Sequence, residues 1–173
     1  MEIRLAEEQE FGVVRQFYHS LIDAMENLRY TPGWKKEIYP SDADLKKALG
    51  LGQLFIGLEG EQIVSAMIVN HDVNEGYLKV SWPTGAEPHE VTVIHTLGVH
   101  PDFSGRGYAK ELVAKAILTA RERDQKAVRL DVLAGNIPAE RLYTGIGFQY
   151  VDALKMYYED TGWAQYKLFE YPL

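Results

Sequence analysis

A glycine-rich turn at residues 104–110 carries the chemistry most easily read from this sequence. Gly105 and Gly107 stand between a β-branched run over 91–99 and an apolar stripe that begins at Ala109. The first-turn amides of a helix lack internal hydrogen-bond partners, and the helix dipole adds positive potential there. Glycines let the backbone approach a phosphate without Cβ clashes. The stretch therefore predicts a site for a phosphorylated ligand at residues 104–110.

Two common phosphate-binding patterns fit this turn poorly. A P-loop requires Gly-x-x-x-x-Gly-Lys-Ser/Thr, and the sequence contains no such run. A dinucleotide fingerprint requires Gly-x-Gly-x-x-Gly, but Lys110 stands where its third glycine would be. An acidic residue about twenty positions later is also expected at a strand end, whereas Asp124 lies in a charged run that ends a helix. These departures disfavour a nicotinamide-dependent oxidoreductase.

The segment over 97–110 resembles the pyrophosphate-binding motif of the GNAT superfamily of acyl-CoA-dependent N-acyltransferases, which reads Gln/Arg-x-x-Gly-x-Gly/Ala. Gly107 and Ala109 match its last two positions, and Ser104 stands where glutamine or arginine is usual. A second segment, 136–148, is similar to the downstream pattern Asn-x-x-Ala-x-x-Leu-Tyr-x-x-x-Gly-Phe of the same superfamily. Two motifs in the right order and spacing are far more specific than one.

The resemblance implies acetyl-CoA as co-substrate and no metal. The amides of the turn would hold the pyrophosphate, and the backbone of Leu97 and Val99 would pair with the pantetheine arm. The side chain of Asn136 would bond to the same arm, or cap the following helix instead. The residues implied to contact the co-substrate are Leu97, Val99, Ser104, Gly105, Arg106, Gly107, Tyr108, Ala109, Lys110 and Asn136.

The resemblance also implies a general acid and leaves the base open. Tyr143 matches the tyrosine that protonates the leaving thiolate, and a phenol with a pKa of about 10 stays protonated at neutral pH. The superfamily often places a glutamate on the central strand, where this chain has Val93. His95, with an ordinary pKa of about 6.5, is the candidate base or a residue that orders a water. His89, Glu90 and a water chain to solvent are the alternatives.

The resemblance places the acceptor near the first helices and the loop between them. Tyr30, Trp34 and Tyr39 would line that pocket, with Tyr77 and Trp82 opposite. The implied reaction is direct transfer of an acetyl group to a primary amine, on a small molecule or a peptide N-terminus. The alternative is a non-catalytic sensor that binds acetyl-CoA. Homodimers are common in the superfamily, so a homodimer is consistent with the resemblance.

The spacing of apolar residues predicts the elements that position these groups. Alternating apolar residues predict strands, and apolar residues at helical spacing predict helices. Along the chain these elements follow the order β-α-α-β-β-β-α-β-α-β-β. We expect an α/β fold of the GNAT type: a mixed sheet of six to seven strands, flanked by about four helices, with splayed central parallel strands. Gly98 is expected to form the bulge that starts the splay. A further short strand is predicted over 77–82 in the irregular stretch before the central strand.

Composition fits a cytoplasmic protein that forms one domain over residues 1–173. Of these residues, 46% are hydrophobic and 25% charged, which suits a soluble chain with a single core. A formal net charge of −7 disfavours nucleic acid as a partner. No apolar run approaches the ~18 residues of a transmembrane helix, so no membrane contact is expected. The absence of cysteine excludes disulfides, thiolate metal sites and a cysteine nucleophile.

Overall fold

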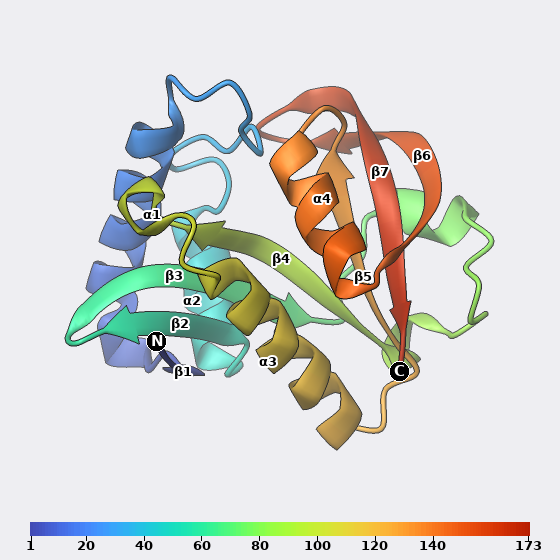
Figure 1. Ribbon diagram of the computed structural model, residues 1–173, viewed down its shortest axis with the longest axis horizontal. Helices are drawn as coiled ribbons and strands as arrows, with labels where there is room; N and C mark the ends of the chain where they lie inside the picture. The colour runs from blue at the N-terminus through green and yellow to red at the C-terminus, as the bar shows by residue number, and fades with distance from the viewer.

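A mixed sheet of seven strands runs through the molecule in the order β1-β2-β3-β4-β5-β7-β6, and the computed structural model describes residues 1–173 (Figure 1). The strands are β1 (Glu2–Leu5), β2 (Leu54–Glu59), β3 (Gln62–Asn70), β4 (Val91–Val99), β5 (Ala127–Leu133), β6 (Gln149–Tyr158) and β7 (Gly162–Pro172). The α-helices are α1 (Phe11–Met25), α2 (Asp42–Gly50), α3 (Tyr108–Glu122) and α4 (Ile137–Ile146). The predicted order of strands and α-helices is confirmed. None of the helices is long and apolar enough to span a bilayer.

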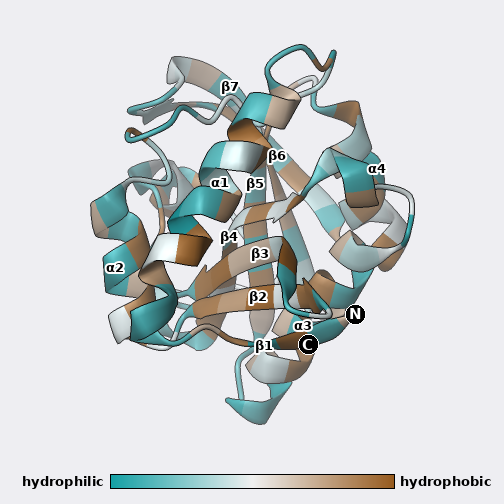
Figure 2. Ribbon diagram, turned by 90° about the vertical axis from the view of Figure 1, so that its left-hand side faces the viewer, coloured by the Kyte–Doolittle hydropathy of each residue, from teal (hydrophilic) through white to brown (hydrophobic).

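Side-chain alternation along β2 and β3 divides the core between the two faces of the sheet. Phe55 and Met67 pack with residues of α3 and α4 on one face. Their neighbours Ile56 and Ala66 pack with residues of α1 and α2 on the other. Figure 2 shows the result, with hydrophobic segments concentrated in β2 and β3 and hydrophilic segments over much of α2. Helices therefore cover both faces, as the sequence predicts.

The central parallel strands β4 and β5 diverge, which confirms the predicted splay (Figure 1). They pair only where Val91–Val93 meets Ala127–Arg129. A bulge interrupts the pairing of β4 with β3, and Thr96 within it has a left-handed φ of 48°. The prediction that Gly98 forms this bulge is wrong. Gly98 instead allows close packing, because a Cβ there would lie 2.4 Å from Leu21 Cδ2 on α1.

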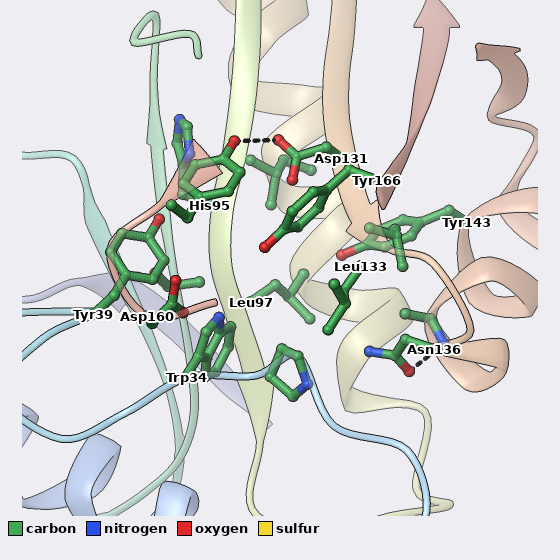
Figure 3. Close-up of a pocket in the computed structure, with 16 residues that line it drawn as sticks. Trp34, Tyr39, His95, Leu97, Asp131, Leu133, Asn136, Tyr143, Asp160 and Tyr166 are labelled. Carbon is green, nitrogen blue, oxygen red and sulfur yellow. Dashed lines mark hydrogen bonds between the residues drawn. The ribbon is translucent and has the colours of Figure 1, made fainter. Parts of the chain in front are cut away.

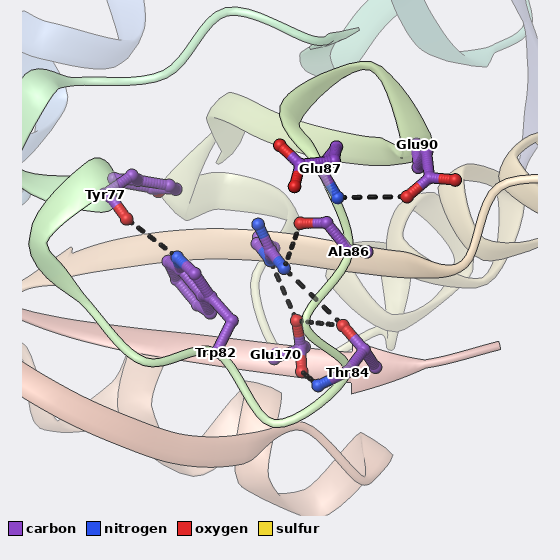
Figure 4. Close-up of polar contacts among 8 residues, drawn as sticks. Tyr77, Trp82, Thr84, Ala86, Glu87, Glu90 and Glu170 are labelled. Atoms are coloured by element: carbon purple, nitrogen blue, oxygen red, sulfur yellow. Dashed lines mark hydrogen bonds and ion pairs between the residues drawn. The ribbon is translucent and has the colours of Figure 1, made fainter.

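The connection between β3 and β4 is held by a buried ion pair rather than by a strand. The predicted strand over 77–82 is wrong, because Glu75–Lys79 forms a 3-10 helix. Arg129 Nε on β5 donates to Glu170 Oε2 on β7 at 2.8 Å. The other Glu170 oxygen accepts the Thr84 amide at 2.9 Å, and the Arg129 guanidinium lies 4.2 Å from the Trp82 ring centroid (Figure 4). These contacts fix the connection against β5 and β7.

Candidate functional site

A cavity of about 110 Å³ lies where β4 and β5 diverge (Figure 3). The two strands contribute its walls, and α4 closes one side. The loop between α1 and α2 and the hairpin formed by β6 and β7 close the other side. Its lining includes the side chains of Trp34, Tyr39, His95, Leu97, Asp131, Asn136, Tyr143, Tyr158, Asp160 and Tyr166. The splay therefore brings together groups from segments that are far apart in the sequence.

The glycine-rich turn presents six consecutive backbone amides without a hydrogen-bond partner. None of the amides of residues 105–110 donates to a backbone or side-chain acceptor. Gly105 and Gly107 have φ values of 77° and 84°, a conformation that glycine adopts without steric cost. Tyr108 then begins α3, so its dipole adds positive potential at the same place. This arrangement can hold an anion of the size and charge of a pyrophosphate.

Two side chains of the turn are engaged within the protein. The Ser104 hydroxyl donates to the Pro101 carbonyl at 2.7 Å. The Arg106 guanidinium donates to both carboxylate oxygens of Glu59, at 2.9 and 3.1 Å, and stacks on the Phe103 ring. Anion binding at this turn consequently depends on the backbone amides. The exposed Lys110 side chain forms no ion pair and is the one cationic group of the turn that is free to contact an anion.

The edge of β4 that faces β5 has no strand neighbour beyond Val93. Leu97 and Val99 lie on this part of β4, so the strand edge there can pair with an extended ligand. Asn136 also lines the cavity, and its Oδ1 accepts the Ala139 amide at a long 3.5 Å as the N-cap of α4. Its Nδ2 makes no hydrogen bond within the protein. The capping role and the ligand role predicted for this residue are therefore compatible.

Tyr143 presents a phenol without a hydrogen-bond partner to the cavity. The end of α4 fixes its place, because the amides of Gly147 and Phe148 both donate to the Tyr143 carbonyl. The ring packs edge-on against Phe148, and the residue is 7% exposed. Its hydroxyl points into the cavity in Figure 3. Burial and then the charge of Asp131 raise the pKa of Tyr143 above its usual 10, so the phenol stays protonated at neutral pH.

Asp131 on β5 faces the same cavity, and its role was not predicted from the sequence. Its Oδ2 accepts hydrogen bonds of 2.8 Å from the hydroxyls of both Tyr77 and Tyr158. Its Oδ1 has no partner within the protein. Burial raises the pKa of Asp131, and the two tyrosine hydrogen bonds act against that rise. The available signal was a pair of charged residues, Arg129 and Asp131, at alternate positions of an otherwise apolar strand.

His95 reaches the cavity but has the properties of a weak base. Its Nε2 lies 2.8 Å from Asn70 Oδ1, so this nitrogen carries the proton and donates. Burial lowers the pKa of His95 to about 4, which leaves the ring neutral at neutral pH. The two alternative residues lie outside the cavity lining: His89 is exposed, and Glu90 pairs with Lys126. The two carboxylates that line the cavity, Asp131 and Asp160, both have a raised pKa, and each keeps one oxygen without a partner.

The predicted acceptor residues divide into those that line the cavity and those that do not. Trp34 and Tyr39 line it, whereas Tyr30 lies outside the lining, with the Arg29 guanidinium over its ring. Tyr77 and Trp82 also lie outside the lining. The Tyr77 hydroxyl donates to Asp131 Oδ2, and the Trp82 ring stacks on the Arg129 guanidinium. The β6–β7 hairpin adds three side chains that sequence reasoning missed, Tyr158, Asp160 and Tyr166. Their positions depend on the pairing of β7 with β5, a long-range contact that local sequence does not encode.

The sequence is similar to those of known acetyltransferases. Residues 16–148 match the Acetyltransferase (GNAT) family. The chain is 36% identical over 87 residues to the N-alpha-acetyltransferase RimI of Mycobacterium tuberculosis, a match that covers 50% of this chain and 52% of that protein. It is also 37% identical over 75 residues to an uncharacterized N-acetyltransferase of Methanocaldococcus jannaschii, a match that covers 43% of this chain and 33% of that protein. The chain thus spans about half or less of the length of these curated relatives.

Solved structures extend the likeness of the fold over the whole chain. A GNAT-family acetyltransferase from Listeria monocytogenes superposes with a TM-score of 0.76 at 16% identity, covering 99% of this chain and 94% of that one. Arabidopsis thaliana NAA60, solved in complex with acetyl-CoA, superposes with a TM-score of 0.70 at 17% identity, covering 99% and 98%. At these identities the likeness concerns the fold. The family match over most of the sequence shows that the chain belongs to the acetyltransferase (GNAT) family.

Proposed function

We propose that this protein transfers the acetyl group of acetyl-CoA to a primary amine by direct attack within a ternary complex. The observation that carries the proposal is one cavity, lined by the unpaired Tyr143 phenol and the Asp131 carboxylate, beside the open edge of β4. Family membership supports the reaction type, and the Arabidopsis neighbour is described with acetyl-CoA bound. The chain contains no cysteine, so no acyl-cysteine intermediate can form.

The residues suit acetyl-CoA from its pyrophosphate to its thioester. The six free amides over 105–110 would receive the pyrophosphate oxygens. The backbone of Leu97 and Val99 would pair with the amides of the pantetheine arm, and Asn136 Nδ2 would bond to the same arm. The thioester would then lie between the diverging strands, near Tyr143. None of the residues of the amide turn lines the cavity that contains Asp131 and Asp160, so the phosphates would meet the amide donors.

The proposed reaction forms one C–N bond and breaks one C–S bond. The bound ammonium first loses a proton, and the neutral amine attacks the thioester carbonyl carbon. The tetrahedral intermediate collapses with loss of the CoA thiolate, which takes the Tyr143 proton, while the nitrogen loses a second proton that restores Tyr143. The products are an N-acetyl amine, free CoA thiol and one proton. The raised pKa of Tyr143 keeps its phenol protonated until the thiolate leaves.

We assign the first deprotonation to Asp131 rather than to His95. Burial raises the pKa of Asp131, which makes it a stronger base than an exposed aspartate, whereas burial lowers the pKa of His95 to about 4, which makes it a weaker base than an exposed histidine. The free Oδ1 of Asp131 is available to an ammonium, while Oδ2 is held by Tyr77 and Tyr158. His95 would orient the site through Asn70. Val93 is fully buried in the core and, being a valine, supplies no carboxylate at that position.

Thiol release in the presence of acetyl-CoA and a panel of primary amines tests the proposal. The chain has no cysteine, so a thiol-reactive dye reports CoA alone. The expected result is amine-dependent release, with the acetylated amine identified by mass spectrometry. If acetyl-CoA binds but no amine releases thiol above the rate without amine, the protein is a binding module and the proposal fails.

A further inference from the structure

The acceptor side of the cavity is walled by aromatic rings. Trp34 and Tyr39 come from the loop between α1 and α2, and Tyr158 and Tyr166 come from the β6–β7 hairpin. The Tyr158 and Tyr166 rings meet edge-on with centroids 5.0 Å apart, and the Tyr39 ring lies 6.4 Å from that of Tyr158. Such walls suit an alkyl chain and attract a cation through the ring faces.

Two carboxylates face this aromatic enclosure without a cationic partner. Asp160, in the turn between β6 and β7, is 4% exposed; its Oδ1 accepts the Thr161 amide at 2.9 Å, and its Oδ2 has no partner. Asp131 likewise keeps Oδ1 free. Neither carboxylate forms an ion pair with a lysine or arginine. Negative charge that is desolvated and unpaired favours a ligand that supplies positive charge.

The two carboxylates share one enclosure but occupy different parts of it. Burial raises the pKa of both, and the charge of Asp160 adds to the rise at Asp131, whereas the charge of Lys35 lowers the pKa of Asp160 without forming an ion pair. Figure 3 shows Asp131 and Asp160 at separate places in the cavity, with Tyr39 and Trp34 near Asp160. A ligand with two separated cationic groups can therefore satisfy both carboxylates.

The two walls touch above the acceptor side. The left-handed Gly33, with φ 86°, packs so closely on the β6–β7 turn that an added Cβ would lie 2.6 Å from Thr161 Cγ2. The Tyr39 and Tyr158 rings make a second contact between the same walls. These contacts hold the loop between α1 and α2 against the β6–β7 hairpin, and both segments line the cavity. The narrow space between them favours a small molecule over a peptide N-terminus.

We propose that the acceptor is a small alkyl diamine, with one ammonium held at Asp131 for acetylation and the other held at Asp160. The proposal rests on the acetyl transfer proposed above and specifies its substrate. The ammonium at Asp131 loses its proton and attacks the thioester, as in the general reaction. The ammonium at Asp160 keeps its charge throughout and fixes the length of chain that reaches the thioester. Asp160 is thus a specificity residue of the acceptor site.

Rates of CoA release with putrescine, butylamine and a short peptide with a free N-terminal alanine test this specificity. Putrescine and butylamine have the same carbon chain and differ by one ammonium. We expect kcat/KM for putrescine to exceed that for butylamine by at least about tenfold, and the peptide to give only background release. Equal values for the two amines, or efficient use of the peptide, would overturn the diamine assignment while leaving acetyl transfer intact.

The substitution Asp160→Asn tests whether this residue sets the specificity. Glu159→Gln, at the exposed neighbouring residue, is the matched control. We expect Asp160→Asn to abolish the preference for putrescine over butylamine, mainly through KM, and Glu159→Gln to retain it. Calorimetric titration of putrescine and butylamine into the protein–CoA complex gives a readout that does not need turnover. Tighter binding of putrescine in wild type but not in Asp160→Asn supports the site even if acetylation fails; equal binding contradicts it.

Discussion

The Tyr158 hydroxyl on β6 donates a hydrogen bond of 2.8 Å to Asp131 Oδ2 on β5, although β7 lies between these strands in the sheet. The Tyr77 hydroxyl reaches the same oxygen from the connection between β3 and β4. Two fixed donors on one oxygen orient the carboxylate and leave Oδ1 facing the cavity. The proposed catalysis depends on this orientation, because it places a free basic oxygen on the same cavity as the Tyr143 phenol.

Asp131→Asn should lower kcat by about a hundredfold or more, since the amide cannot accept the ammonium proton. Affinity for acetyl-CoA should be retained, because Asp131 lies on the acceptor side. Steady-state thiol release and calorimetry measure the two quantities, and Asp152→Asn, an exposed position on β6, is the control. The rate of the wild-type enzyme should fall as pH drops through the raised pKa of Asp131. An unchanged kcat in Asp131→Asn would mean that Asp131 is not the base and that His95 or water accepts the proton.

Tyr143→Phe should keep acetyl-CoA binding and lose about a hundredfold in kcat, because the ring stays but the acidic proton is gone. The phenol makes no hydrogen bond within the protein, so its loss should leave the free energy of unfolding nearly unchanged. Tyr150→Phe, at a residue 57% exposed on β6, provides a matched substitution. Acetyl transfer at the wild-type rate in Tyr143→Phe would remove the general-acid assignment.

Gly107→Ala should weaken acetyl-CoA binding by about tenfold or more, because a Cβ enters the amide turn where the phosphate approaches. Gly60→Ala, in the turn between β2 and β3, is the control. Both glycines have positive φ, 84° and 59°, and neither has an atom near an added Cβ, so both substitutions should destabilise by roughly 1 kcal/mol. Calorimetry and urea unfolding separate the effects. Equal acetyl-CoA affinity in both variants would show that the turn does not hold the phosphates.

His95 should make stability fall as the pH drops from about 6.5 toward 4. The unfolded chain takes up a proton on this ring in that range, whereas in the folded protein burial lowers its pKa to about 4. Between pH 7 and pH 5 the loss from this group is about 2 kcal/mol. Urea unfolding should therefore show a smaller loss in His95→Gln than in wild type. The exposed His89→Gln should behave as wild type, and an identical loss in all three proteins would mean that His95 titrates normally.

Much of the fold was predictable because its signals are local. Ser41 and Asp42 are both residue types that cap helices, and the Ser41 side chain accepts the Asp44 amide at the start of α2. The two motifs fixed the turn before α3 and the helix that carries Tyr143. The bulge was misplaced because Gly98 is a local signal, whereas the left-handed Thr96 is held by the hydroxyl of Tyr18, 78 residues away, which donates to its carbonyl.

The acceptor side was less predictable because long-range contacts create it. Asp131 takes its hydrogen bonds from Tyr77 and Tyr158, which are 54 and 27 residues away in the chain. His95 was predicted at the cavity and does reach it, but its burial and its partner Asn70 depend on the packing of β3 against β4. A sequence pattern gives the type of such residues and their strand. It does not give the solvation that decides which one is the base.

Calorimetric titration of the wild-type protein with acetyl-CoA, beside NADH and ATP, tests the central claim most directly. We predict saturable binding of acetyl-CoA at one site per chain, because its pyrophosphate and pantetheine arm match the amide turn and the free edge of β4. NADH and ATP should not bind measurably, since neither has a pantetheine arm. Absence of acetyl-CoA binding, or equally tight binding of NADH, would contradict the assignment of this site.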